Sequence, residues 1–323
     1  MDAGEDCISG LPDELLHAIL VRLGSTRAAV RTGVLSRRWR HVWASLPELV
    51  LEERVDAPPP PASFLDTVDA ALAACDAPAL ERLSIALRAE YGGGVLAGRI
   101  EPWLRFASER VVGALFLYVP PRILPFFEPE VDGEEAAVLE LPASGGVTGM
   151  DLSLGGPWRL RPPSSGLFGK LTHLAILLPA WKAASSHPSV WKTRQLEIVA
   201  SRLEKLSVSN AIDEARISAL KLAELSWSNA AYDPRCHQFD DVGHRLRLLE
   251  LGQSSTVASL MQQFDEVDEL KLGISIPQKH TCLPSCPCRL EQSHRIDAIS
   301  LNSLEEVEIT SYTSSHEVLE FVE

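Results

Sequence analysis

The chain has 323 residues, of which 46% are hydrophobic and 23% charged, as expected for a globular protein long enough for two domains and a large core. Its formal net charge of -14 argues against general binding to nucleic acid, because a polyanionic partner would meet a repulsive average field. The acidic start lacks a signal-peptide core, and no segment approaches the roughly 18 apolar residues of a membrane span. We therefore expect an intracellular protein, cytoplasmic or nuclear, that binds neither nucleic acid nor membranes.

A small helical module is predicted at 8–51, after a disordered N-terminus at 1–7. Behind a proline whose fixed φ suits a first helical turn, leucine and isoleucine recur at helical spacing and predict a helix from about 12 to 22. Ser25-Thr26 can cap a second short helix and Ser36 a third. About forty residues are too few to bury two strongly apolar helical faces within their own fold, so the surplus indicates a partner protein.

The order of residues from Leu11-Pro12 to Trp43 resembles an F-box, and the stretch from Val30 to Trp43 resembles the plant F-box/leucine-rich-repeat families, which carry an FBD-like C-terminal region. The resemblance implies a Skp-type adaptor as partner and, through it, a cullin, a RING subunit and a ubiquitin-conjugating enzyme. It also implies a set of adaptor-binding residues that divide their apolar area between an internal core and the adaptor: Leu11, Pro12, Leu15, Leu16, Ile19, Leu20, Val34, Leu35 and Trp39.

Two alternatives apply to this module. Its apolar residues can all face an internal core, which would make it a plain helical cap on the rest of the chain. The run Arg37–His41, basic with an interleaved aromatic residue, is also a feature of nucleic-acid surfaces. The helical spacing of Trp39 and Trp43 instead favours a core stripe.

A proline-rich stretch predicts a linker at 52–63, since proline lacks the amide donor and restricts the residue before it. Helical spacing then runs from Phe64 to Asp76, and Arg99 to Glu109 predicts a further helix. Between and after them, one template recurs: apolar, two variable, apolar, one variable, apolar. Its nine copies are Leu80-Leu83-Ile85, Val112-Leu115-Leu117, Val147-Met150-Leu152, Leu171-Leu174-Ile176, Leu203-Leu206-Val208, Leu222-Leu225-Trp227, Leu246-Leu249-Leu251, Val267-Leu270-Leu272 and Leu304-Val307-Ile309.

These copies predict an irregular leucine-rich-repeat solenoid over 64–323, an α/β fold with a parallel sheet on its concave face and, by the resemblance, an FBD-like C-terminal part. Copies start 19 to 37 residues apart, whereas leucine-rich repeats have periods of about 20–29 residues. The chain stops inside the apolar run at 317–322, where a solenoid ordinarily has a polar capping turn. An array that ends in this way is typical of a shortened product.

The variable positions of the template predict the binding face. The last two apolar residues of each copy lie two apart and point inward, so the residues before and between them face the open side. We expect the substrate-facing residues to be Arg82, Phe116, Asp151, His173, Lys205, Glu224, Glu250, Glu269, Lys271, Glu306 and Glu308. The C-terminal half of this face is acidic, which suits a basic peptide or protein patch. The alternative is a solvated face whose charges only prevent aggregation.

One cluster has the donor types of a zinc site: Cys282, Cys286 and Cys288, with His280 nearby. Its spacing, with Pro287 between the last two cysteines, departs from the usual paired knuckles and favours a reduced structural loop. We expect no metal and no cofactor. The chain also lacks the common hydrolase, phosphate-binding and metalloprotease motifs, so we expect no catalysis by the chain itself.

The function that the resemblance implies is that of a non-catalytic substrate receptor in an SCF-type cullin-RING ubiquitin ligase. The repeats would hold a target protein so that its lysines lie near a ubiquitin-charged enzyme supplied by other subunits. Two alternatives stay open. One is a scaffold without a role in ubiquitination, and the other is a small-molecule receptor, which needs a deep pocket with convergent polar groups.

Overall fold

The protein is described by a computed structural model that covers residues 10–53, 63–88, 95, 97–120, 138–141, 145–155, 159–161, 168–177, 195–209, 212, 214–228, 232–243, 245–252, 257–274, 301 and 303–311. The chain divides into two compact units, Met1–Pro179 and Ala180–Glu323. No helix of the described residues is long and apolar enough to cross a membrane. The predictions for 1–7 and for most of the linker at 52–63 lie outside the described residues.

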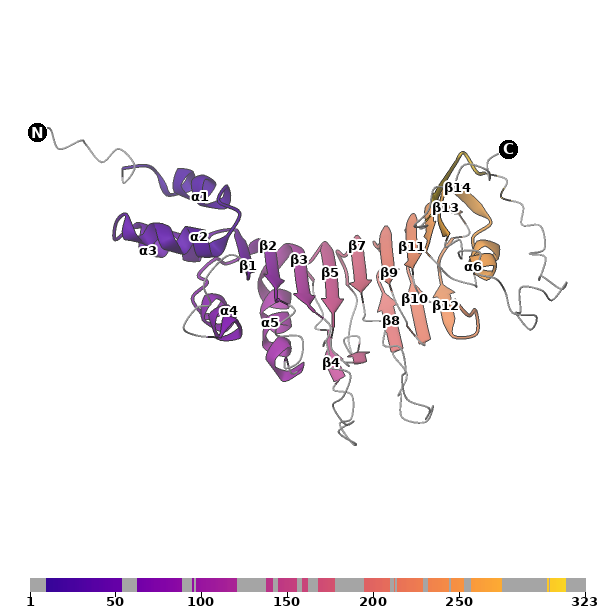
Figure 1. Ribbon diagram of the computed structural model, residues 1–323, viewed down its shortest axis with the longest axis horizontal. Helices are drawn as coiled ribbons and strands as arrows, with labels where there is room; N and C mark the ends of the chain where they lie inside the picture. Colours follow the sequence, from indigo (N-terminus) through magenta and orange to yellow (C-terminus); the bar gives the residue numbers. More distant parts are fainter. Residues whose placement is uncertain are drawn as a thin grey trace, which may run out of the picture. The chain divides into compact units, whose positions relative to one another are not determined.

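The first unit begins with short helices. They are α1 (Asp13–Val21), α2 (Thr26–Arg31), the 3-10 turn η1 (Thr32–Val34), α3 (Trp39–Val42) and the 3-10 turn η2 (Trp43–Ser45) (Figure 1). The chain turns after α1 at Gly24, whose φ of 63° is a left-handed conformation that glycine adopts without strain. Three helices are predicted here, and the structure follows α2 and α3 with 3-10 turns that tighten their ends.

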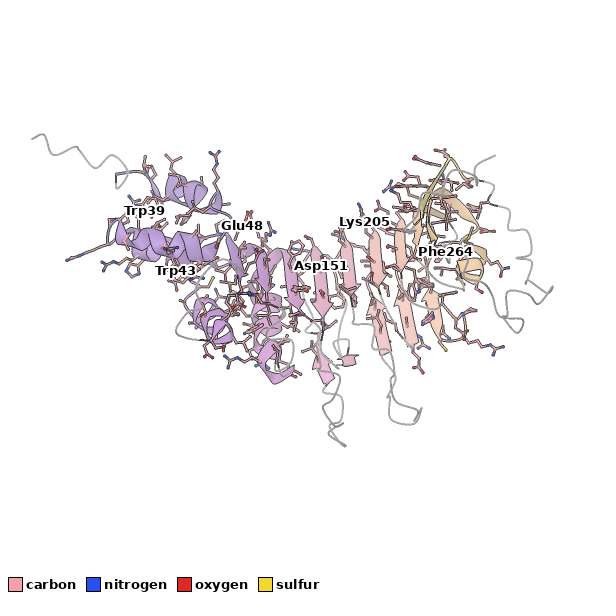
Figure 2. The ribbon with its side chains drawn as sticks, in the orientation of Figure 1. Trp39, Trp43, Glu48, Asp151, Lys205 and Phe264 are labelled. Atoms are coloured by element: carbon pink, nitrogen blue, oxygen red, sulfur yellow. The ribbon has the colours of Figure 1, made fainter. Side chains whose placement is uncertain are left out.

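One apolar core joins these helices, and Trp39 and Trp43 lie among them (Figure 2). Its buried members come from α1, α2, α3 and the segment after η2: Leu16, Leu20, Ala29, Trp39, Val42 and Leu46. Leu11, Val21 and Trp43 pack against it with part of their surface still exposed. Each fully buried leucine stabilises the fold by roughly 1.5–3 kcal/mol, so this core accounts for much of the stability of the module.

A parallel sheet follows in the same unit. Its strands are hydrogen-bonded in the order β1 (Glu48–Glu52), β2 (Leu80–Ala86), β3 (Val111–Val119), β5 (Gly149–Leu154) and β7 (His173–Leu177). The first four template copies form β2, β3, β5 and β7. β1 is not among the predicted strands, although Leu46-Leu49-Leu51 repeats the template inside the segment assigned to helices, and all three leucines are buried. The parallel sheet therefore starts within 8–51.

The copy that starts at Val112 is shifted by one residue from its prediction. An irregularity of the register between β2 and β3 leaves Val111 buried and Val112 exposed, so the predicted burial of Val112 is wrong. Gly113 lies at this irregularity, and a Cβ there would overlap the carbonyl oxygen of Glu81. The bulge therefore requires glycine at this position, because a residue with a Cβ atom would not fit.

The return segments of the first unit include the helices α4 (Phe64–Ala73) and α5 (Ala97–Arg110) and the short paired strands β4 (Val138–Glu140) and β6 (Arg159–Arg161). The helix predicted from Arg99 to Glu109 is confirmed by α5. Trp103 of α5 is buried, and its indole N–H donates to Asp69 Oδ1 of α4 at 2.6 Å. Successive return helices are thus joined by a side-chain hydrogen bond as well as by apolar packing.

The second unit contains the other five template copies, again in a parallel sheet. Its strands follow the order β9 (Lys205–Ser209), β11 (Glu224–Ser228), β13 (Arg245–Leu251), β14 (Glu266–Ile274) and β15 (Glu306–Ser311). In β15, Val307 and Ile309 are exposed, so the ninth copy encloses no core within the residues described here.

The return segments of the second unit form a second parallel sheet that the sequence does not predict. It has the order β12 (His237–Asp240), β10 (Glu214–Ser218) and β8 (Gln195–Val199), and the helix α6 (Val257–Gln263) precedes β14. Trp227 of β11 meets the rings of His237 and Phe239 of β12, with centroids 5.2 and 6.2 Å away, and Phe239 meets Phe264. This aromatic cluster joins the two sheets.

Candidate functional site

The helical module exposes two rows of large apolar side chains although its core is closed. Along α1 and just after its end, Leu15, Ile19 and Leu23 repeat every four residues and are exposed. From α2 to η1 a second row is exposed: Val30, Val34 and Leu35, of which Val34 is 86% exposed. We call these six residues the apolar rows. Exposed apolar surface gathered on one small module is characteristic of a protein interface.

The predicted adaptor-binding set divides between the core and the apolar rows. Leu16, Leu20 and Trp39 are buried in the core, Leu11 is half-buried against it, and Pro12 is exposed at the start of α1. Leu15, Ile19, Val34 and Leu35 are exposed and available to a partner. Leu23 and Val30 were not in the predicted set, although Leu15, Ile19 and Leu23 share a spacing of four that identifies Leu23 from the sequence.

Polar contacts fix how the helices of this module are arranged. Arg38, just before α3, donates from Nε to Asp13 Oδ1 at 3.0 Å and so ties α3 to the first turn of α1. His17 Nε2 lies 3.1 Å from Ser45 Oγ. Exposed pairs of this kind contribute at most about 1 kcal/mol each, so they orient the helices more than they stabilise them.

The open face of the first unit carries its four predicted substrate-facing residues in two adjacent rows. The strand register gives one row Glu48, Arg82, Ala114, Gly149 and His173, and the next row Val50, Ser84, Phe116, Asp151 and Ala175. Arg82 lies with its guanidinium carbon 5.1 Å from the centroid of the Phe116 ring. All four predicted residues are exposed, as the template implies.

Asp151 is the charged residue at the centre of this face. The register sets Phe116 on one side of it and Ala175 on the other (Figure 2 labels Asp151 on β5). Among the residues that the structure describes, its carboxylate has neither a hydrogen bond nor an ion pair. Partial desolvation raises the pKa of Asp151 above its ordinary value, because water solvates the charged form less well beside these apolar neighbours.

The open face of the second unit also brings its predicted residues together. One row across the strands contains Lys205, Glu224, Leu248, Glu269 and Glu306, and the next contains Ser207, Ser226, Glu250, Lys271 and Glu308. Seven predicted residues therefore occupy two neighbouring rows. Lys205 lies on β9 (Figure 2).

Internal ion pairs neutralise much of the acidic strip predicted here. Glu224 Oε2 lies 3.1 Å from Lys205 Nζ, and its other oxygen accepts from Arg247. Arg247 also pairs with Glu269 at 3.2 Å, and Lys271 Nζ lies 2.7 Å from Glu308. Burial acts to raise the pKa of Glu224, but hydrogen bonds and charge from Arg247 and Lys205 outweigh it, and the net pKa is lowered.

Arg247 is the residue of this network that the sequence reasoning missed. It stands on β13, between β11 and β14, and its side chain pairs with Glu224 of β11 and Glu269 of β14. Glu250 and Glu306 have no ion pair within the described part of the unit.

The predicted cysteine loop, Cys282 to Cys288, lies outside the described residues. Within the described residues, no group of three or more His, Cys, Asp or Glu side chains is arranged to hold a metal ion. Cys75 and Cys236 are free thiols, the first buried and the second exposed.

Comparison with curated proteins finds plant F-box proteins. The chain is 55% identical over 47 residues to F-box/LRR-repeat protein 25 of Arabidopsis thaliana, a match covering 15% of this chain and 18% of that protein. It is 35% identical over 124 residues to F-box/LRR-repeat protein At4g14103 of the same plant, covering 37% and 31% of the two chains. It is also 35% identical over 126 residues to an FBD-associated F-box protein of Arabidopsis thaliana, covering 37% and 30%.

The chain thus spans 18% to 31% of the length of these relatives. No family model matches it, and no solved structure matches it. The names of the relatives support the predicted F-box, leucine-rich-repeat and FBD assignments and a plant origin. Over about a third of its length, the chain is similar to plant F-box/LRR-repeat proteins and to an FBD-associated F-box protein.

Proposed function

We propose that the chain is the substrate-recognition subunit of an SCF-type cullin-RING ubiquitin ligase. In this proposal the helical module binds a Skp-type adaptor, as an F-box does, and the open face of the repeat strands binds a target protein. Similarity to F-box proteins supports an F-box adaptor role, which typically serves SCF ligases. The chain itself performs no chemistry, as is general for F-box/LRR relatives.

The observation that carries the proposal is the exposure of the apolar rows on a module whose own core is complete. Leu16 and Leu20 fill that core, while their neighbours Leu15 and Ile19 face away from it. An apolar patch with no internal role is stabilised when a partner covers it, at roughly 25 cal/mol per Å² removed from water. We assign the adaptor contact to the apolar rows. Leu16, Leu20 and Trp39 form the core on which the helices that carry these rows are packed.

The charge of the module fits the same assignment. Arginines flank the apolar rows, with no acidic residue between Glu14 and Glu48: Arg22, Arg27, Arg31, Arg37, Arg38 and Arg40. Stable interfaces are apolar at the centre and polar at the rim, where charge speeds association more than it adds affinity. We therefore expect substitution of a rim arginine to slow adaptor binding and substitution in the apolar rows to abolish it.

The direct test is co-purification with a plant Skp-type adaptor and a cullin. Val34→Glu places a charge at the most exposed position of the apolar rows and should reduce adaptor recovery at least tenfold, because a buried unpaired carboxylate costs several kcal/mol. Leu220→Glu is the matched control, since Leu220 is 69% exposed but lies in the second unit. It should leave recovery unchanged.

Two outcomes would contradict the proposal. Adaptor recovery by Val34→Glu equal to wild type would show that the apolar rows are not the adaptor contact. Recovery of the adaptor without cullin would indicate a scaffold outside any ubiquitin ligase. Far-ultraviolet circular dichroism of both variants verifies that the fold is retained.

A further inference from the structure

Asp151 is surrounded on the open face by a grid of positions, defined by the strand register, that hold no other carboxylate. On β3 the neighbours are Ala114, Phe116 and Tyr118; on β5 they are Gly149 and Ser153; on β7 they are His173, Ala175 and Leu177. Adjacent strands lie about 4.8 Å apart and alternate residues about 6.7 Å apart, so each of these positions lies within about 8 Å of Asp151. No lysine or arginine occupies the grid.

The grid combines small residues with large exposed ones. Ala114, Gly149 and Ala175 project no more than a methyl group beside the carboxylate. Phe116, Tyr118 and Leu177 are 37%, 44% and 41% exposed, so three large side chains offer apolar surface on the same face. The guanidinium of Arg82 stacks on Phe116 and restricts its ring. Aromatic side chains held in this way are typical energetic centres of protein interfaces.

Asp151 differs from three of the five acidic residues on the open face of the second unit. There, Glu224, Glu269 and Glu308 are neutralised by Lys205, Arg247 and Lys271 of the same chain. Within the described residues no lysine or arginine pairs with Asp151, and partial desolvation already raises its pKa. A carboxylate that is partly desolvated and unpaired is complementary to a cation supplied by another molecule.

We propose that the open face around Asp151 is the site that selects targets, and that it takes a protein segment in which a lysine or arginine adjoins a leucine or aromatic residue. The cationic group pairs with the Asp151 carboxylate, and the adjoining apolar side chain packs on Phe116, Tyr118 and Leu177. The inference rests on the proposed function for the role of the bound segment as a ubiquitination target. It places recognition in the first unit and not on the acidic strip predicted for the second.

The test uses the full chain, co-expressed with its adaptor, and a set of fluorescein-labelled synthetic 15-residue peptides. Each peptide carries a central leucine or phenylalanine next to lysine, arginine, glutamine or glutamate. Fluorescence anisotropy should show tighter binding of the lysine and arginine peptides, and added salt should weaken it because the pair is partly exposed. Asp151→Asn should reduce affinity for these peptides about threefold to tenfold and remove the preference for basic residues.

Two further variants locate the effect. Glu250→Gln is the matched control, because it removes one unpaired carboxylate from the open face of the second unit and changes the net charge equally. It should leave the preference intact. Asp151→Lys should reverse the preference toward the glutamate peptides. Equal loss in Asp151→Asn and Glu250→Gln, or a wild-type chain without preference for basic peptides, would overturn the inference.

The adaptor assay keeps this inference separate from the proposed function. Asp151→Asn should bind the adaptor like wild type, whereas Val34→Glu should lose the adaptor and keep the peptide preference. If the adaptor fails to bind the wild-type chain while the preference depends on Asp151, the ligase role is wrong and the site stands. If the adaptor binds and the preference is absent, the site is wrong.

Discussion

The hydroxyl of Thr26 accepts a hydrogen bond from the backbone N–H of Val50 at 2.8 Å, so helix α2 covers the outer edge of strand β1. Thr26 is buried, and its hydroxyl gives the backbone N–H of Val50 on this edge strand an acceptor that it would otherwise lack. The helical module and the repeat sheet are consequently continuous. Thr26 is the first residue of α2, and the N-cap residue Ser25 makes no capping hydrogen bond with its side chain.

Thr26→Val should lower the free energy of unfolding by about 1–3 kcal/mol, because it keeps the shape of the side chain and leaves the Val50 N–H buried without an acceptor. Thr26→Ser retains the hydroxyl and should cost less. Urea unfolding followed by tryptophan fluorescence measures both. Equal losses in the two variants would mean that the methyl group, and not the hydrogen bond, is what stabilises this junction.

Gly113→Ala should disrupt the pairing of β2 and β3, since the added Cβ would overlap the carbonyl oxygen of Glu81. We expect a loss of about 2–4 kcal/mol in stability. Gly149→Ala is the matched control on β5, where the nearest atom to an added Cβ is the Cβ of Ala114 at 4.0 Å. It should change the thermal midpoint little. Similar midpoints for the two variants would contradict the close approach of the strands at Gly113.

The sequence predicts the inner face of the sheets well because burial of every second residue leaves a direct apolar pattern. It fails where geometry departs from that pattern. Val112 is exposed because a bulge shifts the register, and Val307 is exposed on the last strand that the structure describes. A strand of the second sheet has only two buried apolar positions, such as Leu196 and Ile198 in β8. Two positions are too few to distinguish a strand from a loop in the sequence.

The candidate sites are predictable to a similar extent. Which residues lie on the open face follows from the two-residue period, and the structure places all of those named there. The sequence does not predict which of these carboxylates stay unpaired. Arg247 pairs with carboxylates on two different strands, and these pairs can be recognised only when the strand register is known. In the helical module, the split between buried Leu16 and exposed Leu15 depends on how α1 packs on α2 and α3, which a helical period alone leaves open.

The Glu224 network should make the second unit less stable in acid. Because the pKa of Glu224 is lowered in the folded chain, its pairing stabilises the fold above the ordinary value of 4.5 and is lost as the pH falls through the lowered pKa. Glu224→Gln should therefore be less stable than wild type at pH 7 by about 0.5–1 kcal/mol, since Lys205 and Arg247 are half-exposed and screened. The two proteins should converge as the pH falls below the lowered pKa, and urea unfolding at a series of acidic pH values measures this. A difference that does not change with pH would contradict the ion-pair explanation.

His237 is buried in the aromatic cluster with both ring nitrogens bonded to the backbone. Its Nδ1 accepts from the N–H of Asp233 at 2.9 Å, so the neutral ring carries its proton on Nε2, which donates to the carbonyl of Ile212 at 3.0 Å. The ring also stacks on Tyr232, with centroids 5.5 Å apart. One side chain therefore joins two loop segments to the cluster around Trp227.

His237→Phe keeps the stacked ring and removes both hydrogen bonds, and should destabilise the second unit by about 1–3 kcal/mol because one buried and one partly buried backbone group lose their partners. His237→Gln offers an acceptor and a donor without the ring, and should recover part of that loss. Near-ultraviolet circular dichroism of Trp227 and Tyr232, followed through thermal unfolding, reports on the cluster directly. If His237→Phe proved as stable as wild type, the ring contacts alone would hold the segment in place, and the hydrogen bonds would have no measurable role.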